Sequence, residues 1–77
     1  MSHLPRLSGK EAVKVFERFG WEVVRRRSSH IIMVKEGHMA TLSVPDHKEV
    51  AQGTLRSLIR SAGITVAEFT EASKEFW

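Results

Sequence analysis

The spacing of apolar side chains changes twice along this chain, and these changes restrict the folds that it can adopt. Over residues 12–19 and 55–62, apolar residues recur at intervals of three and four, which is the pattern of one face of an α-helix. Between them, over residues 21–44, short runs rich in β-branched residues are separated by polar turns, as in a set of strands. This order predicts an α+β protein in which helices pack on a small sheet.

The beginning of the first helix is marked by a capping signal. Ser8 and Glu11 have the spacing of a capping box, in which the serine hydroxyl accepts a backbone N–H of the first turn and the glutamate reaches back to the serine. We expect this helix over residues 9–19, with Gly20 as its left-handed end.

Three consecutive strands are expected in the middle of the chain, over residues 21–27, 30–35 and 39–44. The dipeptides at residues 28–29 and 36–37 are the turns between them, and Pro45 ends the third strand because proline cannot donate to a ladder. Strands joined by such short turns form an antiparallel meander.

The rest of the chain predicts two more helices. One covers residues 55–62 and closes at Gly63, and a second capping box at Thr65 and Glu68 opens a short third helix. That helix carries the apolar side chains Val66, Phe69 and Phe76. We therefore expect an α-β-β-β-α order with a short C-terminal helix, in which two helices pack on one face of a three-stranded antiparallel sheet and leave the other face available.

A chain of 77 residues predicts a single domain over residues 1–77. The absence of cysteine rules out disulfides and agrees with a reducing cytoplasm. The longest apolar run, Ile31–Val34, is far shorter than the ~18 residues of a membrane span. The first residues also lack the features of a secretory signal. We expect a cytoplasmic protein that does not enter a membrane.

Charge is distributed unevenly along the chain. Residues 1–60 contain eleven of the twelve Lys and Arg residues but only six of the nine acidic residues. Residues 61–77 contain the remaining base and three glutamates. A basic body with an acidic tail suits a polyanionic partner for the body, although an ordinary solvated surface is also consistent with this charge.

His30 is the best candidate for chemistry, because it opens the second expected strand directly after a run of three arginines. A histidine of ordinary pKa near ~6.5 can both take and give a proton at neutral pH. RNA cleavage requires a base for the 2′-hydroxyl, an acid for the leaving oxygen and cations near the phosphoryl oxygens. The alternative is a strand histidine that caps a turn or packs beside Ile32.

His47 follows the end of the third expected strand. Antiparallel pairing would return that end beside the start of the second strand and bring His47 towards His30. His47 would then be a second acid or base, or a phosphate contact together with Lys48. A metal site is not expected, because Asp46 is the only nearby acid. We assign His38 to a solvated loop and no role to His3.

The basic side chains suggest a path for a phosphate backbone. Residues 25–27 are consecutive arginines, so they must alternate between the two faces of a strand. Arg56 and Arg60 share a helix face and, with Lys48, could follow the phosphates. Basic residues on an edge strand also discourage aggregation. Trp21 and Trp77 could stack on bases, but a tryptophan just after a helix is more often a core residue.

Taken in order, several segments resemble the HicA toxin family, and the resemblance covers about residues 8–69. It lies in Phe19-Gly20-Trp21, Ser29-His30, Val44-Pro45-Asp46-His47 and, most specifically, Gly53-Thr54-Leu55 followed by Ala62-Gly63-Ile64. Members of that family are small RNases (mRNA interferases) with a fold similar to double-stranded-RNA-binding domains.

The resemblance implies a toxin of a type II toxin–antitoxin system that cleaves RNA without a metal or cofactor. The histidine of the family's Ser-His pair is held responsible for cleavage, and here it is His30. A glycine usually precedes that pair, whereas this chain has Ser28. A HicB-like antitoxin would cover the active surface in a hetero-oligomer. The expected RNA contacts are Arg26, Arg27, Ser29, Lys48 and Arg56.

Two other functions fit the same sequence. A non-catalytic double-stranded-RNA-binding module would have the same fold and charge, would cover ~16 base pairs and would not need His30 for affinity. A protein-interaction module would bind no RNA even at low salt.

Overall fold

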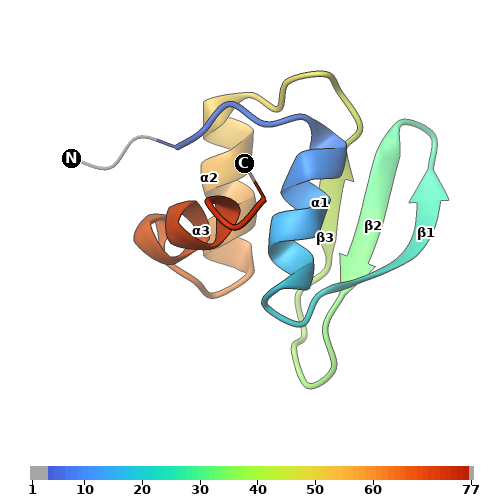
Figure 1. Cartoon of the computed structure of the whole chain (residues 1–77). Coiled ribbons are helices and arrows are strands. Elements are labelled where there is room, and N and C mark those ends of the chain that lie inside the picture. Colours follow the sequence, from blue (N-terminus) through green and yellow to red (C-terminus); the bar gives the residue numbers. More distant parts are fainter. Residues whose placement is uncertain (1–3, 77) are drawn as a thin grey trace.

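The computed structural model describes residues 4–76 and confirms the expected order of elements (Figure 1). The elements are α1 (Gly9–Glu17), β1 (Glu22–Arg27), β2 (His30–Val34), β3 (Leu42–Pro45), α2 (Gln52–Ser61) and α3 (Val66–Ser73). Both capping boxes form, and Gly20 adopts the left-handed conformation expected after α1, with φ +94°. No helix within residues 4–76 is long and apolar enough to cross a bilayer. His3 and Trp77 lie outside the described residues.

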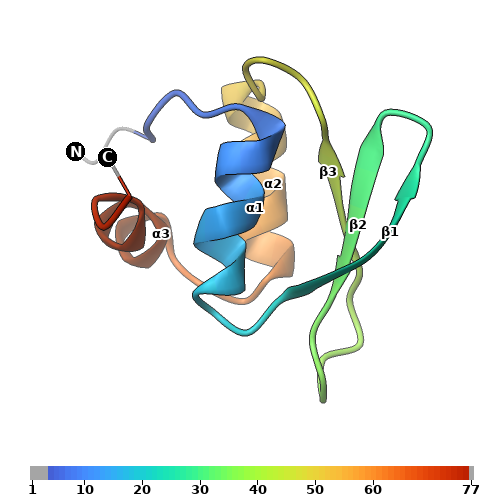
Figure 2. The ribbon, with the colours of Figure 1, turned by 45° about the vertical axis from the view of Figure 1, so that its right-hand side comes forward.

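The three strands form one antiparallel sheet in the order β1-β2-β3. Helices α1 and α2 pack on one face of it, and the other face carries no helix (Figures 1 and 2). Helix α3 lies beyond α1 and α2, on the side away from the sheet (Figure 2). The predicted α+β fold with one open sheet face is therefore confirmed.

The core lies between the sheet and the helices and continues to α3. Ile31 and Met33 point from β2 into this core, so the alternate residues His30 and Ile32 belong to the open face. The ring of Phe69 on α3 lies 5.0 Å from another buried aromatic ring on α1. Trp21 is a core residue and 1% exposed, so it offers no surface for stacking on a base.

Strand β1 is exposed along all six of its residues, because it forms the edge of the sheet farthest from α2 (Figure 1). A β-bulge at Val24 interrupts its pairing with β2. Such a bulge inserts one unpaired residue, so the alternation of side chains changes at that point. Arg25, Arg26 and Arg27 all follow the bulge, so they alternate between the two faces of the sheet.

The third strand begins at Leu42, so the expectation that it begins at Met39 is wrong. His38 explains the difference, because its Nδ1 atom accepts the N–H of Ala40, and that amide is lost to the ladder. The His38 ring is partly buried and lies 5.0 Å from the ring of Trp21, so it is not a solvated loop residue. Phe76, assigned to the third helix, lies beyond its end and is 39% exposed.

Candidate active site

His30 lies at one end of the sheet, in its central strand. It is exposed, and it pairs with Arg27 on β1 and with Pro45 on β3. Directly opposite residues of two antiparallel strands project from the same face. His30 and Arg27 therefore share the open face, so the imidazole has a guanidinium as its nearest cross-strand neighbour and is accessible to a large ligand.

The turn before His30 has the geometry that a glycine would favour. Ser28 and Ser29 form a two-residue loop between the paired residues Arg27 and His30. Ser28 has φ +59°, and it is the only non-glycine residue of residues 4–76 with a positive φ. Glycine is preferred at the first position of a two-residue hairpin loop with this sign of φ. The serine that replaces the family's glycine thus keeps the backbone in a glycine-like conformation.

Arg26 differs from Arg27 in both its face and its partner. It pairs with Ile31, which faces the helices, and its guanidinium donates a 2.5 Å hydrogen bond to the carboxylate of Asp46. This hydrogen bond is the main reason that the pKa of Asp46 lies below its usual value, and a partial loss of hydration opposes the shift. Asp46 is therefore an anion at neutral pH, and the guanidinium of Arg26 forms an ion pair with it.

The other two arginines of β1 face the open side of the sheet. Arg25 pairs with Ile32 beyond the bulge and so shares the open face with Arg27. Within residues 4–76, neither arginine forms an ion pair. Arg25 was not among the expected RNA contacts, although strand alternation alone places it on the same face as Arg27.

The loop after β3 brings His47 to the same end of the sheet. The N–H of Asp46 donates to the carbonyl of Ser29 at 2.7 Å, and the N–H of Gly9 donates to the carbonyl of His47 at 2.9 Å. Because Pro45 is opposite His30, His47 lies two residues beyond that pair. The expectation that the end of the third strand returns beside the start of the second is confirmed.

A shallow hollow lies between this loop and the first turn of α1. Its lining residues are Ser8, Lys10, Asp46, His47 and Lys48. Lys10 was missed at the sequence level, because the capping box accounts for this segment as a helix start and does not show what the helix end contacts. The available signal was Gly9, an unusual residue for a first helical turn unless the backbone must approach another segment.

Arg56 is not grouped with this end of the sheet. It lines a separate hollow with Arg60 on α2, and Ile64 and Val66 near the start of α3 complete it. The structure therefore pairs His30 with Arg27 and places His47 and Lys48 on the loop after β3 at the same end of the sheet, whereas Arg56 lies elsewhere.

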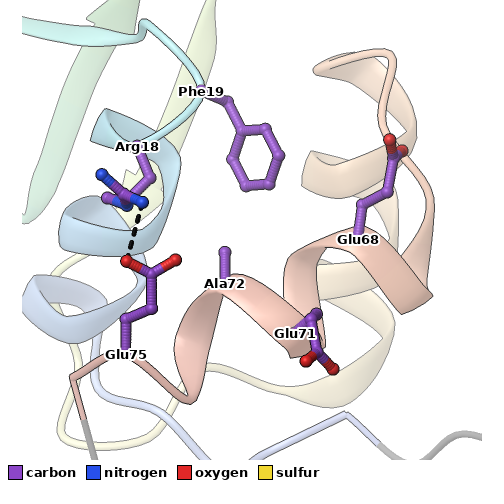
Figure 3. Close-up of a pocket in the computed structure, with 6 residues that line it drawn as sticks. All are labelled: Arg18, Phe19, Glu68, Glu71, Ala72 and Glu75. Carbon is purple, nitrogen blue, oxygen red and sulfur yellow. Dashed lines mark ion pairs between the residues drawn. The ribbon is translucent and has the colours of Figure 1, made fainter.

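A third hollow lies between the end of α1 and α3 and carries the opposite charge (Figure 3). The carboxylates of Glu68, Glu71 and Glu75 surround the apolar side chains of Phe19 and Ala72, and Arg18 forms a 2.7 Å ion pair with Glu75. Three carboxylates repel a polyanion, so this hollow does not suit RNA.

Metal-ligand side chains do not cluster in the part of the chain that the structure describes. Within residues 4–76, no three His, Asp or Glu side chains gather closely enough to hold a metal ion. The groups present at the His30 end are imidazoles, cations, hydroxyls and the single carboxylate of Asp46.

The structure is thus a small α+β fold with an exposed imidazole and basic side chains at one end of its sheet. The family model of the HicA toxin of bacterial toxin–antitoxin systems matches residues 9–64. That range is most of the chain, and the protein belongs to this family. No curated protein matches the sequence closely enough to serve as a relative. The matched range ends before α3.

Proposed function

We propose that this toxin is an endoribonuclease that cleaves RNA on its open sheet face, with His30 as a general acid–base group. Toxins of this family are generally RNases. The observation that carries the proposal is the cross-strand pair of His30 and Arg27, an exposed imidazole beside a guanidinium on a sheet face that no helix covers.

The reaction follows from the groups at this end of the sheet. His30 takes the proton of a ribose 2′-hydroxyl, and the 2′-oxygen forms a bond to the adjacent phosphorus. The bond from phosphorus to the 5′-oxygen breaks, and that oxygen receives a proton from an imidazolium, so the products are a 2′,3′-cyclic phosphate and a 5′-hydroxyl. Arg27 stabilises the negative charge that builds up on the non-bridging oxygens.

The remaining candidate residues divide into two groups. His47 supplies the second proton-transfer group or a phosphate contact, and Ser29 and Lys48 contact the phosphates beside it. Arg26 acts as a positioning residue, because its ion pair with Asp46 fixes the loop that carries His47 and Lys48. Arg56 is reached only by an RNA that extends along α2.

An antitoxin partner is consistent with a family of toxin–antitoxin systems. We propose that a HicB-like protein inhibits this toxin by covering the His30 end of the sheet, in a hetero-oligomer. An acidic or shape-matched surface would complement the basic side chains there. Cleavage of mRNA would place the toxin in the bacterial cytoplasm.

The test compares purified wild-type protein with His30→Ala on RNA in buffer containing EDTA. His30→Ala is expected to lose at least about 100-fold in rate, which is typical of removing a general acid or base, and to lose its effect on cell growth. It should keep its fold, because the ring is exposed. Lys14→Ala is the control, since it removes an exposed basic side chain that lines a different hollow.

Two results would contradict the proposal. Cleavage by His30→Ala at the wild-type rate would exclude an acid–base role for this imidazole. Binding of about 16 base pairs of double-stranded RNA by the wild-type protein, without any cleavage, would instead support the alternative of a non-catalytic binding module.

A further inference from the structure

The hollow beside the proposed active site is built by a close contact between α1 and the end of β3. A Cβ atom on Gly9 would lie only 2.1 Å from the carbonyl oxygen of Pro45 and 2.8 Å from the Cα of Asp46. Only glycine allows this approach, and the hydrogen bond from Gly9 to His47 holds it. Lys10 is therefore anchored beside the loop that carries His47 and Lys48.

The charges in this hollow favour an anion. Lys10, His47 and Lys48 line it from two separate segments, and Asp46 is the only acid among its lining residues. The charge of Asp46 is already engaged by the guanidinium of Arg26. What remains is a set of basic side chains on a surface that is open to solvent.

The end of the α1 helix is not what attracts the anion. The Ser8 hydroxyl accepts the N–H of Glu11 at 3.1 Å, and the N–H of Gly9 is bonded to the carbonyl of His47. The Glu11 carboxylate accepts the N–H of Ser8 at the same helix end. Because these helix-end groups are already used, the attraction must come from the side chains of the two lysines and the histidine.

The hollow lies at the same end of the sheet as His30. Pro45 is the direct partner of His30, and the next residue, Asp46, donates its N–H to the carbonyl of Ser29. His47 lies only two residues beyond Pro45, which is at most about 7 Å of chain. The hollow therefore lies at the same end of the sheet as His30 but on the side of α1, so an RNA strand that passes around this end would reach both.

We propose that the hollow of Lys10, His47 and Lys48 binds the backbone phosphate next to the one that is cleaved. This proposal rests on the proposed ribonuclease function and adds Lys10 as a binding residue for the substrate. A contact to a phosphate that does not react strengthens binding of the ground state and of the transition state equally, so it lowers KM. The contact is made to phosphate alone, so it is independent of base sequence.

The test measures binding of a short 2′-O-methyl RNA, which lacks the attacking hydroxyl, by fluorescence anisotropy at several salt concentrations. Lys10→Ala should weaken binding about fivefold, as expected for the loss of one exposed charge contact. The slope of log binding constant against log salt concentration (the salt slope) should decrease in magnitude by about 0.7. Lys10→Arg should restore both. With cleavable RNA, Lys10→Ala should raise KM and leave kcat unchanged.

Lys14→Ala is the matched control, because Lys14 is an exposed lysine one turn further along α1 and lines a different hollow. Its affinity and salt slope should equal those of the wild type. If Lys10→Ala behaves like Lys14→Ala, the phosphate site is excluded while cleavage by His30 still stands.

His30→Ala separates the two proposals, since it should abolish cleavage while its binding of the uncleavable RNA still depends on Lys10. Binding that depends on Lys10 in a protein that cuts no RNA would reject the ribonuclease and keep a phosphate site. Loss of antitoxin binding without loss of RNA binding in Lys10→Ala would instead assign the hollow to acidic side chains of a protein partner and overturn the proposal.

Discussion

Ser28 holds a backbone conformation that an L-amino acid adopts only at a cost. A left-handed φ costs a non-glycine residue roughly 1–2 kcal/mol, and glycine avoids that cost but loses about 0.4–1 kcal/mol through its more flexible unfolded chain. Because Ser28 has φ +59°, we expect Ser28→Gly to raise the free energy of unfolding by about 0.5–1 kcal/mol in urea titrations.

Ser29→Gly is the control for that variant, because Ser29 lies in the same turn without a positive φ. It should lower the free energy of unfolding by up to about 1 kcal/mol, since glycine then adds only unfolded-state entropy. A loss of stability in both variants would show that the turn does not depend on a glycine-like residue at position 28.

At the residue level, the sequence predicted the site only in part. The type and position of His30 predicted an imidazole at a strand end, and the register confirms where that strand begins. Three consecutive arginines gave no means of choosing between Arg26 and Arg27. The choice follows from the pairing of Arg27 with His30 and from the ion pair of Arg26 with Asp46, and neither contact can be recognised in the run of arginines itself. Whether these side chains contact RNA stays a prediction.

Among the elements, α3 is outside the range matched by the family model but belongs to the core. Phe69 is fully buried, and its ring contacts that of Phe16 on α1. Phe69→Ala should lower the free energy of unfolding by about 3–5 kcal/mol, because it removes a buried ring and leaves a cavity. The total free energy of unfolding of a small domain is only about 5–15 kcal/mol, so we expect a large drop in the thermal midpoint.

Phe76→Ala is the comparison for this effect, since it also removes an aromatic ring near the end of the chain. Phe76 is 39% exposed and lies beyond α3. Phe76→Ala should therefore lower the free energy of unfolding clearly less than Phe69→Ala does. Equal losses would mean that α3 is held by its end and not by its contact with α1.

The elements that local signals define were predicted best. Both capping boxes and the helical spacing of apolar residues located α1 and α3, because these interactions lie within a few residues of each other. The start of β3 was missed because the alternation of apolar residues continues through Met39. There the imidazole of His38 takes the amide of Ala40, and packing on Trp21 holds that imidazole in place. A contact between residues far apart in the sequence overrides the local pattern.

For the whole molecule, the two signs of charge lie in different places. The basic side chains at the His30 end belong to the sheet and the start of α1, whereas Glu68, Glu71 and Glu75 lie on or just after α3, beyond the helices (Figure 2). The molecule measures 32 × 28 × 21 Å. The Debye length is only about 8 Å at physiological salt, so charges on α3 are screened from RNA bound at the sheet.

Removing two of these acids should therefore affect RNA binding only at low salt. We expect the double variant Glu68→Gln, Glu71→Gln to change affinity for the uncleavable RNA by less than about twofold at 0.15 M salt. At 0.01 M salt the Debye length is about 30 Å, which is comparable to the dimensions of the molecule. The double variant should therefore bind the RNA more tightly than the wild type at this salt concentration. Asp46→Asn, at the proposed RNA surface, should change affinity at both salt concentrations, because it removes a nearby anion and breaks the ion pair that fixes the loop of His47 and Lys48. A large gain at 0.15 M from the α3 variant would mean that RNA passes close to α3, and the open sheet face would then not be the binding surface.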